Sequence, residues 1–377
     1  MRILHTADWH IGKIVNEFSM LEDQAEVLHR LVDEVKKLDV DVLIMAGDLY
    51  DRAIPPKEAV ILATEIFTRL IREAGIPVLA IAGNHDSNER LEYGADLLST
   101  SQLYIEGTLK KDIRKVTLKG ANFYLLPFAD HVAIRKLLGN DEIKDLQDAT
   151  RVQIESIKEK MNPDELNILI AHGYVVNGGK ESVEDSDSER PLSIGTAEYV
   201  DVNLFDAFDY VALGHLHKAQ KVKSDRVRYS GSPVKYSKSE AGHKKQHLLV
   251  DLKKDMIDVQ TIPTNPKRDL RVVRGFFDEL MQDESEDYVF FELEDKGYVM
   301  DAMHQLRRRY PYAMGLEYLS KKDRQPKETT RTHQLADKKD VLELFNDFYE
   351  NFKDEPLDDE RKQVVNGVWE DVQKGGE

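Results

Sequence analysis

Short apolar runs recur along the N-terminal part of the chain, and each one ends near Gly, Asp, Asn or His. In chain order they read RILHTAD, VDVLIMAGD, PVLAIAGNHD, LNILIAHG and YVALGHLH. Runs of this length that are apolar at nearly every position are typical of strands buried on both faces. They therefore predict strands that lie inside a layered domain.

Segments with a helical period separate the first strands. Between the first and second runs, apolar residues at 27, 28, 31, 32, 35 and 38 follow one face of a helix. Between the second and third, residues 55–75 begin with two prolines and end at a glycine, as helices do. This alternation of strand and helix predicts an α/β layered domain. RVRYSGS and QHLLVDL follow later with no long helix between them and could form a second sheet.

The pattern changes at residues 262–269, where IPTNPKRD marks a domain boundary. We expect a first domain at 1–265 and a small strand–helix–strand–helix–strand domain at 266–319. Residues 320–336 are polar and lack periodicity, which is typical of a linker. Residues 337–377 contain two apolar stripes with helical spacing, at 341–352 and 364–372. These stripes either pack on the chain's own core or dock on a partner.

The amino-acid composition and charge exclude several kinds of site and of protein. The 377 residues include no cysteine, which excludes disulfides, thiolate zinc sites and cysteine nucleophiles. The start of the chain lacks the pattern of a signal peptide, and no apolar run is long enough to span a membrane, so we expect a cytoplasmic protein. The net charge of −17 argues against a simple nucleic-acid binder. The distribution is uneven, however: residues 218–245 hold nine Lys or Arg against two acids, and residues 337–377 hold thirteen acids against six Lys or Arg.

Five strand ends carry polar side chains of a restricted kind. They are Asp8 and His10; Asp48 and Asp51; Asn84, His85 and Asp86; His172; and His215 with His217. Ligands bind at the carboxyl ends of strands in open α/β sheets, so we expect these residues to converge. Any one of these motifs alone is more often a turn or a cap than a metal site. Together they predict one site, because burying such groups unpaired would be costly.

Carboxylate, imidazole and amide oxygen without thiolate suit manganese, iron or zinc. Two such ions that share a carboxylate bind a phosphate and activate a water for attack on phosphorus. The pair His215 and His217 needs a bend at Gly214 to serve one site, because alternate residues of an extended chain point to opposite sides.

The order D-x-H, G-D-x-x-D, G-N-H-D, H-G, G-H-x-H resembles the signature of the calcineurin-like metallophosphoesterases. MRILHTADWHIGK, GDLYDRAIPP and GNHDS are similar, more narrowly, to the nuclease subunits of bacterial DNA-repair complexes. The similarity in motifs covers residues 1–250. It implies a sandwich of two β-sheets flanked by helices, with a small α/β capping domain and C-terminal helices.

The resemblance also implies a role for each motif residue. One metal ion would be held by Asp8, His10, Asp48 and His217. The second ion would be held by Asp48, Asn84, His172 and His215, so that Asp48 bridges the two. His85 would contact the phosphate and act as general acid for the leaving sugar oxygen. Asp51 lies where related phosphatases have an acid that orients this histidine, and its role here is left open.

The activity implied is that of a manganese-dependent DNA nuclease, an exonuclease on duplex ends and an endonuclease on single-stranded or hairpin DNA. It would act with a coiled-coil ATPase partner in DNA repair, replication and recombination, and it would form a homodimer. The partner, the metals and the basic stretch at 218–245 would offset the acidic total. Two alternatives remain: a phosphoesterase for small-molecule or phosphoprotein substrates, and a non-catalytic scaffold of the same fold. A scaffold would have lost ligands, whereas every motif is intact here.

Overall fold

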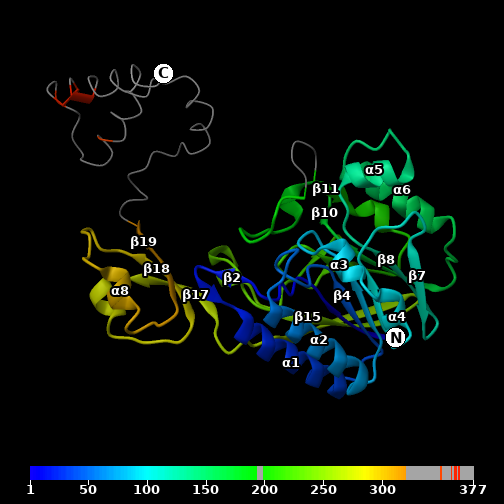
Figure 1. The fold of residues 1–377 in the computed structure, drawn as a ribbon, viewed down its shortest axis with the longest axis horizontal. Coiled ribbons are helices and arrows are strands. Elements are labelled where there is room, and N and C mark those ends of the chain that lie inside the picture. The colour runs from blue at the N-terminus through cyan, green and yellow to red at the C-terminus, as the bar shows by residue number, and fades with distance from the viewer. Residues whose placement is uncertain (193–197, 320–348, 350–357, 359–360, 363, 366–377) are drawn as a thin grey trace. The chain divides into compact units, whose positions relative to one another are not determined.

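The computed structural model describes residues 1–192, 198–319, 349, 358, 361–362 and 364–365 (Figure 1). Met1–Glu317 form one compact unit, and Tyr318–Glu377 form a second. The expected linker at 320–336 lies outside the described residues, as do most of the expected helices at 337–377. The division into four domains therefore stays a prediction.

Six strands form the first sheet, in the spatial order β16-β15-β1-β4-β5-β6. Their bounds are β1 (Arg2–Thr6), β4 (Val42–Ala46), β5 (Val78–Ile81), β6 (Leu103–Glu106), β15 (Gln246–Lys253) and β16 (Met256–Pro263). β1, β4, β5 and β6 are parallel, so their carboxyl ends lie at one edge. β15 pairs antiparallel with β1, and β16 with β15. QHLLVDL is therefore part of the first sheet, not of a second one, because an antiparallel hairpin can join a sheet without a crossover helix.

The second sheet has the order β13-β14-β12-β9-β8-β7. Its strands are β7 (Arg114–Leu118), β8 (Ala121–Leu126), β9 (Leu166–His172), β12 (Tyr210–Gly214), β13 (Gln220–Val222) and β14 (Ser224–Tyr229). The four inner strands are parallel, and β7 and β13 are antiparallel edges. LNILIAHG and YVALGHLH form β9 and β12, so the strands that carry the motifs are divided between two sheets.

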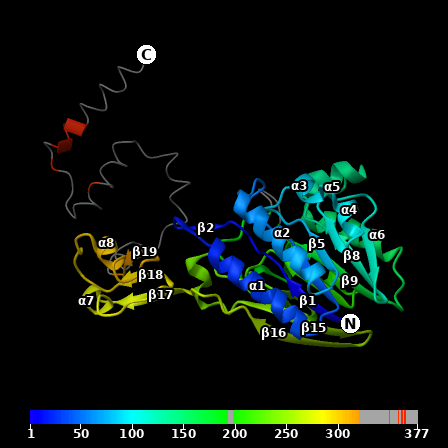
Figure 2. The same cartoon turned by 60° about the horizontal axis from the view of Figure 1, so that its bottom comes forward.

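The two sheets pack face to face with helices on both outer faces (Figures 1 and 2). Ile3 and Ile44 of the first sheet and Ile170 of the second lie in the core between the sheets. Leu4 and Leu43, which alternate with the first two, pack on the outer face with the helices. Both faces of each central strand are thus buried, which explains why the strands are apolar at nearly every position. The predicted fold class is confirmed.

The helices that flank the sheets are amphipathic. They are α1 (Leu21–Lys37), α2 (Lys57–Arg72), α3 (Asn88–Glu92), α4 (Ala95–Ser99), α5 (His131–Leu138) and α6 (Leu146–Lys158). α1 buries Val27, Leu28, Leu31, Val32 and Val35, which is the stripe that the sequence predicts. α1 and α2 cover the first sheet, and α6 packs its Ile154 and Ile157 on the second. No helix among the described residues is long and apolar enough to cross a membrane.

A small three-stranded sheet follows the sandwich. The segment that contains this sheet has strands and helices in the predicted order. They are β17 (Leu270–Gly275), α7 (Phe277–Leu280), β18 (Tyr288–Leu293), α8 (Ala302–Leu306) and β19 (Ala313–Tyr318). We call residues 270–318 the capping module. Leu270, Tyr288 and Met314 share an apolar cluster with Tyr236 of the first domain.

The remaining elements are short. They are the strands β2 (Ile14–Val15), β3 (Phe18–Ser19), β10 (Tyr174–Val176) and β11 (Tyr199–Asp201), and the 3-10 turns Lys180–Ser182, Val202–Phe205 and Lys238–Gly242.

Candidate metal centre

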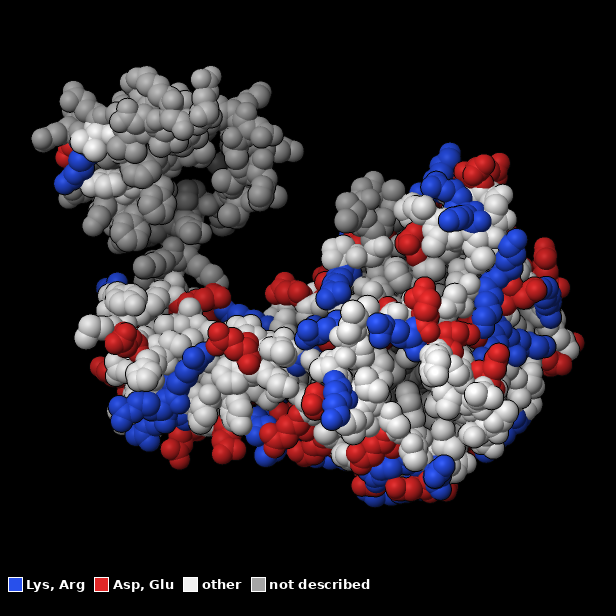
Figure 3. Space-filling view, in the orientation of Figure 1, with Lys and Arg blue, Asp and Glu red and all other residues white. Residues whose placement is uncertain are grey.

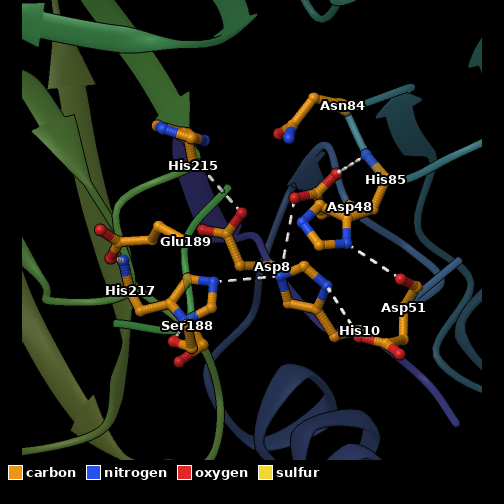
Figure 4. Close-up of polar contacts among 12 residues, drawn as sticks. Asp8, His10, Asp48, Asp51, Asn84, His85, Ser188, Glu189, His215 and His217 are labelled. Carbon is orange, nitrogen blue, oxygen red and sulfur yellow. Dashed lines mark hydrogen bonds and ion pairs between the residues drawn. The ribbon is translucent and has the colours of Figure 1, made fainter. Parts of the chain in front are cut away.

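The polar residues at the five strand ends come together in one buried site, as expected (Figure 4). His172 is the last residue of β9, and the others lie in the loops that follow β1, β4, β5 and β12. Several have a left-handed backbone, which non-glycine residues avoid and which is found most often at functional sites. These are Asp8 (φ 53°), His10 (φ 43°), Asp48 (φ 56°) and His215 (φ 108°).

Two glycines allow the loops of both sheets to approach each other. A Cβ atom on Gly214 would lie 2.0 Å from the carbonyl oxygen of Ala46. A Cβ atom on Gly47, whose φ is 93°, would lie 2.3 Å from Nδ1 of His172. Side chains at either position would therefore push the carboxyl ends of the two sheets apart. Gly214 thus permits the close approach, and the unusual backbone conformation follows at the next residue, His215, whose φ is 108°.

A first group of donor atoms comes from Asp8, His10 and His217, all within 4.8 Å of one another. Nε2 of His10 and Nε2 of His217 lie 3.0 Å apart. Oδ2 of Asp8 is buried and has no hydrogen-bond partner among the described residues. Two imidazole nitrogens and an unpaired carboxylate oxygen thus face one small volume.

A second group comes from Asp8, Asp48 and His172. Nε2 of His172 lies 2.9 Å from Oδ1 of Asn84 and 3.4 Å from Oδ2 of Asp48. The same Oδ2 of Asp48 lies 3.5 Å from Nε2 of His10. One carboxylate oxygen therefore faces both groups, which is the position that a bridging ligand requires.

The direction of the hydrogen bonds shows that a cation fits the second group. Nδ1 of His172 lies 2.9 Å from the carbonyl oxygen of Ala46, to which it can only donate. In the neutral ring Nε2 then carries a lone pair, and it faces the oxygens of Asn84 and Asp48, which are acceptors themselves. Three acceptors that face one another need a proton or a metal ion between them. The donor set suits a divalent ion bound by nitrogen and oxygen.

His215 is placed less clearly as a ligand than the other candidates. Its backbone N–H donates to Oδ1 of Asp8 at 2.9 Å. Its ring lies against the rings of His172 and Tyr174, with centroids 5.5 and 6.0 Å away. Its side chain belongs to none of the groups of ligating atoms found among the described residues. Its role as a ligand therefore rests on the resemblance.

His85 is held by hydrogen bonds from both sides. Its backbone N–H donates to Oδ1 of Asp48 at 2.8 Å, and its Nδ1 lies 2.9 Å from the carbonyl oxygen of Asp51. Nδ1 must donate to that carbonyl, which leaves Nε2 for a substrate. The group that orients His85 is thus the backbone of Asp51, whereas the Asp51 carboxylate accepts from Nζ of Lys13 at 2.8 Å.

Burial and charge set the protonation of the metal-free site. Burial raises the pKa of Asp8 to about 7, and the Asp48 carboxylate adds to this rise. Burial alone would lower the pKa of His172, but Asp48 and Asp8 raise it to about 9. Burial also opposes ionisation of Asp48, yet His172 and His10 hold its pKa well below the ordinary value. In the metal-free site these charges therefore favour a protonated His172 at neutral pH.

Two residues support the site from outside the groups of ligating atoms: Asp86, which the sequence placed at a strand end without a role, and Gln24, which the sequence did not point to. The Asp86 carboxylate accepts from the backbone N–H groups of Leu49, Tyr50 and Gly83, and so joins two of the site's loops. The side chain of Gln24 makes hydrogen bonds to the loop of His10, with Nε2 donating to the His10 carbonyl at 2.8 Å. Gln24 lies in the predicted helix with no motif around it, and a buried glutamine cannot be told from an exposed one by sequence alone.

Comparisons with known proteins agree with this geometry. The calcineurin-like phosphoesterase family matches residues 1–219, which is more than half of the 377 residues. The chain therefore belongs to the calcineurin-like phosphoesterases, a family of hydrolases that use divalent metals. A second family, described as the type 5 capsule protein repressor C-terminal domain, matches residues 266–352. The two domains together support an SbcD-type nuclease subunit, and they confirm the resemblance drawn from the motifs.

Solved structures with this fold are distant in sequence. A protein of Thermus thermophilus is 14% identical, with a TM-score of 0.41, and the match covers 69% of this chain and 98% of that one. A dimetal phosphatase from Danio rerio is 12% identical, with a TM-score of 0.42 and coverage of 70% and 96%. A Plasmodium protein described as the anchor in the inner membrane complex is 12% identical, with a TM-score of 0.40 and coverage of 84% and 96%.

Proposed function

We propose that this phosphoesterase is a metal-dependent DNA nuclease, an exonuclease on duplex ends and an endonuclease on single-stranded or hairpin DNA. The observation that carries the proposal is a buried centre in which two groups of ligating atoms share Asp8, and in which Oδ2 of Asp48 lies near a histidine of each group. This centre belongs to the same compact unit as the capping module up to Glu317. The presence of the second family domain supports a role beyond a simple phosphatase.

The residues of the centre take the roles that the motifs imply. Asp8, His10, Asp48 and His217 would hold one ion, and Asp48, Asn84, His172 and His215 would hold the other. When bound, the two ions, which we expect to be Mn²⁺, supply the Lewis acidity that phosphodiester hydrolysis needs. His85 presents Nε2 toward the substrate and holds its orientation through Asp51 and Asp48. An anionic phosphate beside this ring favours the protonated imidazolium, which can then donate to the leaving oxygen.

Contacts between the capping module and the metal loops support a role in substrate choice. Tyr236 packs with the capping module, and its ring centroid lies 5.6 Å from that of His10 and 5.7 Å from that of His217. The buried Asp23 of α1 accepts from Arg268 Nη1 at 3.0 Å and from the Tyr288 hydroxyl at 2.7 Å. The module is therefore held beside the site by apolar packing and by the hydrogen bond from Tyr288, while Arg268, just before the module, pairs with the same carboxylate.

The basic stretch at 218–245 is a weaker DNA surface than its charge indicates. Six of its nine cations make ion pairs with carboxylates: Lys218, Lys223, Arg228, Lys235, Lys238 and Lys245. Figure 3 shows positive and negative residues interspersed over the visible face of the first domain. DNA contacts would therefore depend on the metals and the partner as well as on this stretch.

We further propose that the chain works with the ATPase SbcC, docked by the two stripes at 341–352 and 364–372. The match of the second family over 266–352 supports this partnership. Of the second stripe, Val364 is described and is 63% exposed. A cytoplasmic location and a role in DNA repair, replication and recombination remain predictions.

A homodimer is also proposed for this chain. Large apolar side chains are exposed at and near the N-terminal end of α2 and on α4, where a second copy could bury them. They are Ile54 (69%), Val60 (41%), Ile61 (54%), Leu97 (78%) and Leu98 (37%). Light scattering after gel filtration should show a dimer for the full chain and a monomer for Ile61→Glu.

The decisive assay uses end-labelled duplex and hairpin DNA with manganese, with and without the ATPase partner. We expect cleavage that chelation abolishes, and partner-dependent processing of duplex ends. A phosphomonoester and a small phosphodiester are tested in parallel. Hydrolysis of the small substrates without any cleavage of DNA would favour the small-molecule phosphoesterase instead, and inactivity on all of them with manganese present would favour a scaffold.

A further inference from the structure

His217 is buried, with 1% of its surface exposed, and all of its polar atoms except one have protein partners that could position it. Its backbone N–H donates to Oε1 of Glu189 at 2.6 Å. Its carbonyl oxygen accepts from Nζ of Lys245 at 2.7 Å. Its Nδ1 lies 2.7 Å from Oγ of Ser188 and 3.2 Å from Oε1 of Glu240. Only Nε2 remains to face the metal centre, 3.0 Å from Nε2 of His10.

The partners of Nδ1 form a chain of hydrogen bonds whose direction can be worked out. Glu240 is fully buried, and its Oε2 accepts from Nζ of Lys245 at 2.5 Å. Its Oε1 makes a short hydrogen bond with the Ser188 hydroxyl. A carboxylate beside a lysine can only accept, so the hydroxyl proton of Ser188 points to Glu240. Ser188 must then accept the Nδ1 proton of His217, and Nε2 keeps its lone pair.

We propose that Glu240, Lys245 and Ser188 are positioning residues that hold His217 in the tautomer with the proton on Nδ1, so that Nε2 is ready to bind metal. The proposal rests on the proposed role of His217 as a metal ligand. It also gives a role to the polar, acidic segment at 177–191, because Ser188 and Glu189 both come from it (Figure 4).

If the Glu240–Lys245 pair served only the stability of the fold, its contacts with His217 would have no explanation. A buried ion pair contributes little net stability compared with apolar residues of similar volume. Here both charged groups also contact His217 itself, one at the ring and one at the backbone carbonyl. A ligating histidine whose second nitrogen is bound to a carboxylate or a hydroxyl has a set tautomer and ring orientation, and loss of that partner typically costs about 10–100-fold in metal affinity.

The substitution Glu240→Gln makes a specific prediction because Lys245 can only donate. The glutamine must turn its carbonyl oxygen to Lys245 and its NH₂ group to Ser188. Ser188 then accepts from the glutamine and donates to Nδ1 of His217, which moves the ring proton to Nε2. The variant should therefore have the opposite tautomer, with a proton on the nitrogen that faces the metal.

Two measurements on the full chain test this. Burial alone would lower the pKa of His217, but Glu240 raises it above its ordinary value, so the metal-free protein is studied at alkaline pH, where the ring is neutral. Histidine ¹⁵N–¹H correlation spectra then report the tautomer, and His217→Asn assigns the signal among the 12 histidines. Calorimetric titration with Mn²⁺ reports the affinity of each site. We expect Glu240→Gln to invert the tautomer and to weaken one site by about 10–100-fold, with the other site little changed. Ser188→Ala should weaken the same site less, and Ser188→Thr should restore it.

Glu106→Gln is the matched control, because Glu106 is 1% exposed and paired with Lys110 and Arg114 away from the centre. It should leave both the tautomer and the affinities unchanged. If Glu240→Gln does not fold, the two Ser188 variants carry the test. Folded variants with the wild-type tautomer and affinities would overturn the proposal. A wild-type chain that shows the Nδ1–H tautomer but binds no Mn²⁺ would instead overturn the proposed metal centre and leave the positioning intact.

Discussion

Asp48→Asn is the substitution that best tests the architecture of the metal centre. Oδ2 of Asp48 lies 3.5 Å from Nε2 of His10 and 3.4 Å from Nε2 of His172, so its charge acts on both groups of ligands. Asparagine keeps the size of the side chain, and its carbonyl oxygen can still accept from the His85 backbone N–H. The change therefore removes one negative charge from the middle of the centre with little change in packing.

The effect of this charge on His172 gives the magnitude. Asp48, with help from Asp8, raises the pKa of His172 from 6.5 to about 9 although burial opposes it. At about 1.36 kcal/mol for each pKa unit, the carboxylates therefore favour the imidazolium by about 3 kcal/mol. A divalent ion carries twice that charge, so Asp48→Asn should weaken each site by about a hundredfold or more. In the metal-free variant the pKa of His172 should fall, because burial is then opposed only by Asp8 and by the hydrogen bond to the Ala46 carbonyl.

Elemental analysis after gel filtration and calorimetry with Mn²⁺ measure the two sites. Asp48→Asn should empty both together, whereas Asp8→Asn should mainly weaken the site that includes His10 and His217. An NMR titration of the metal-free variant follows His172. Full occupancy of both sites in Asp48→Asn would refute the bridging assignment, and an unchanged His172 pKa would refute the electrostatic reasoning.

Three further results are expected. His85→Gln should keep both metals and DNA binding but lose about 10²–10⁴-fold in turnover, and loss of metal would make His85 a ligand instead. Burial lowers the pKa of His5 to about 3 and that of His247 to about 4, so the folded chain binds fewer protons than the unfolded one between these values and 6.5. The free energy of unfolding should therefore decrease as the pH is lowered below 6.5, by about 2 kcal/mol per histidine at pH 5. Urea unfolding of metal-free His247→Leu should show a weaker pH dependence than that of the wild type. Truncation after Thr332 should leave a folded core with manganese-dependent cleavage of simple DNA but abolish binding to the ATPase. A lowered melting temperature of the core would show that the stripes pack internally. Undiminished binding to the ATPase would place the docking surface elsewhere.

The order of residues along the chain was enough to predict the local elements and the candidate ligands of the centre. The strands around Ile3, Ile44 and Ile170 are buried on both faces. Because such strands need apolar residues at nearly every position, they can be recognised in the sequence. The stripe from Val27 to Val35 likewise marks one face of α1. The candidate ligands could be picked out because acids, amides and histidines directly after apolar strands are unusual in five places at once.

The pairing of strands into sheets and the groups that support the candidate ligands became known only from the folded structure. QHLLVDL joins β1, and the motif strands divide between two sheets, because pairing depends on partners far apart in the chain. Glu240 and Lys245 count in the sequence as charges of a basic stretch, yet they are buried against His217. A polar side chain has the same identity whether it is solvated or buried. Its role is set by the few groups that lie within hydrogen-bond distance of it, and those groups are brought there only by the folding of the whole domain.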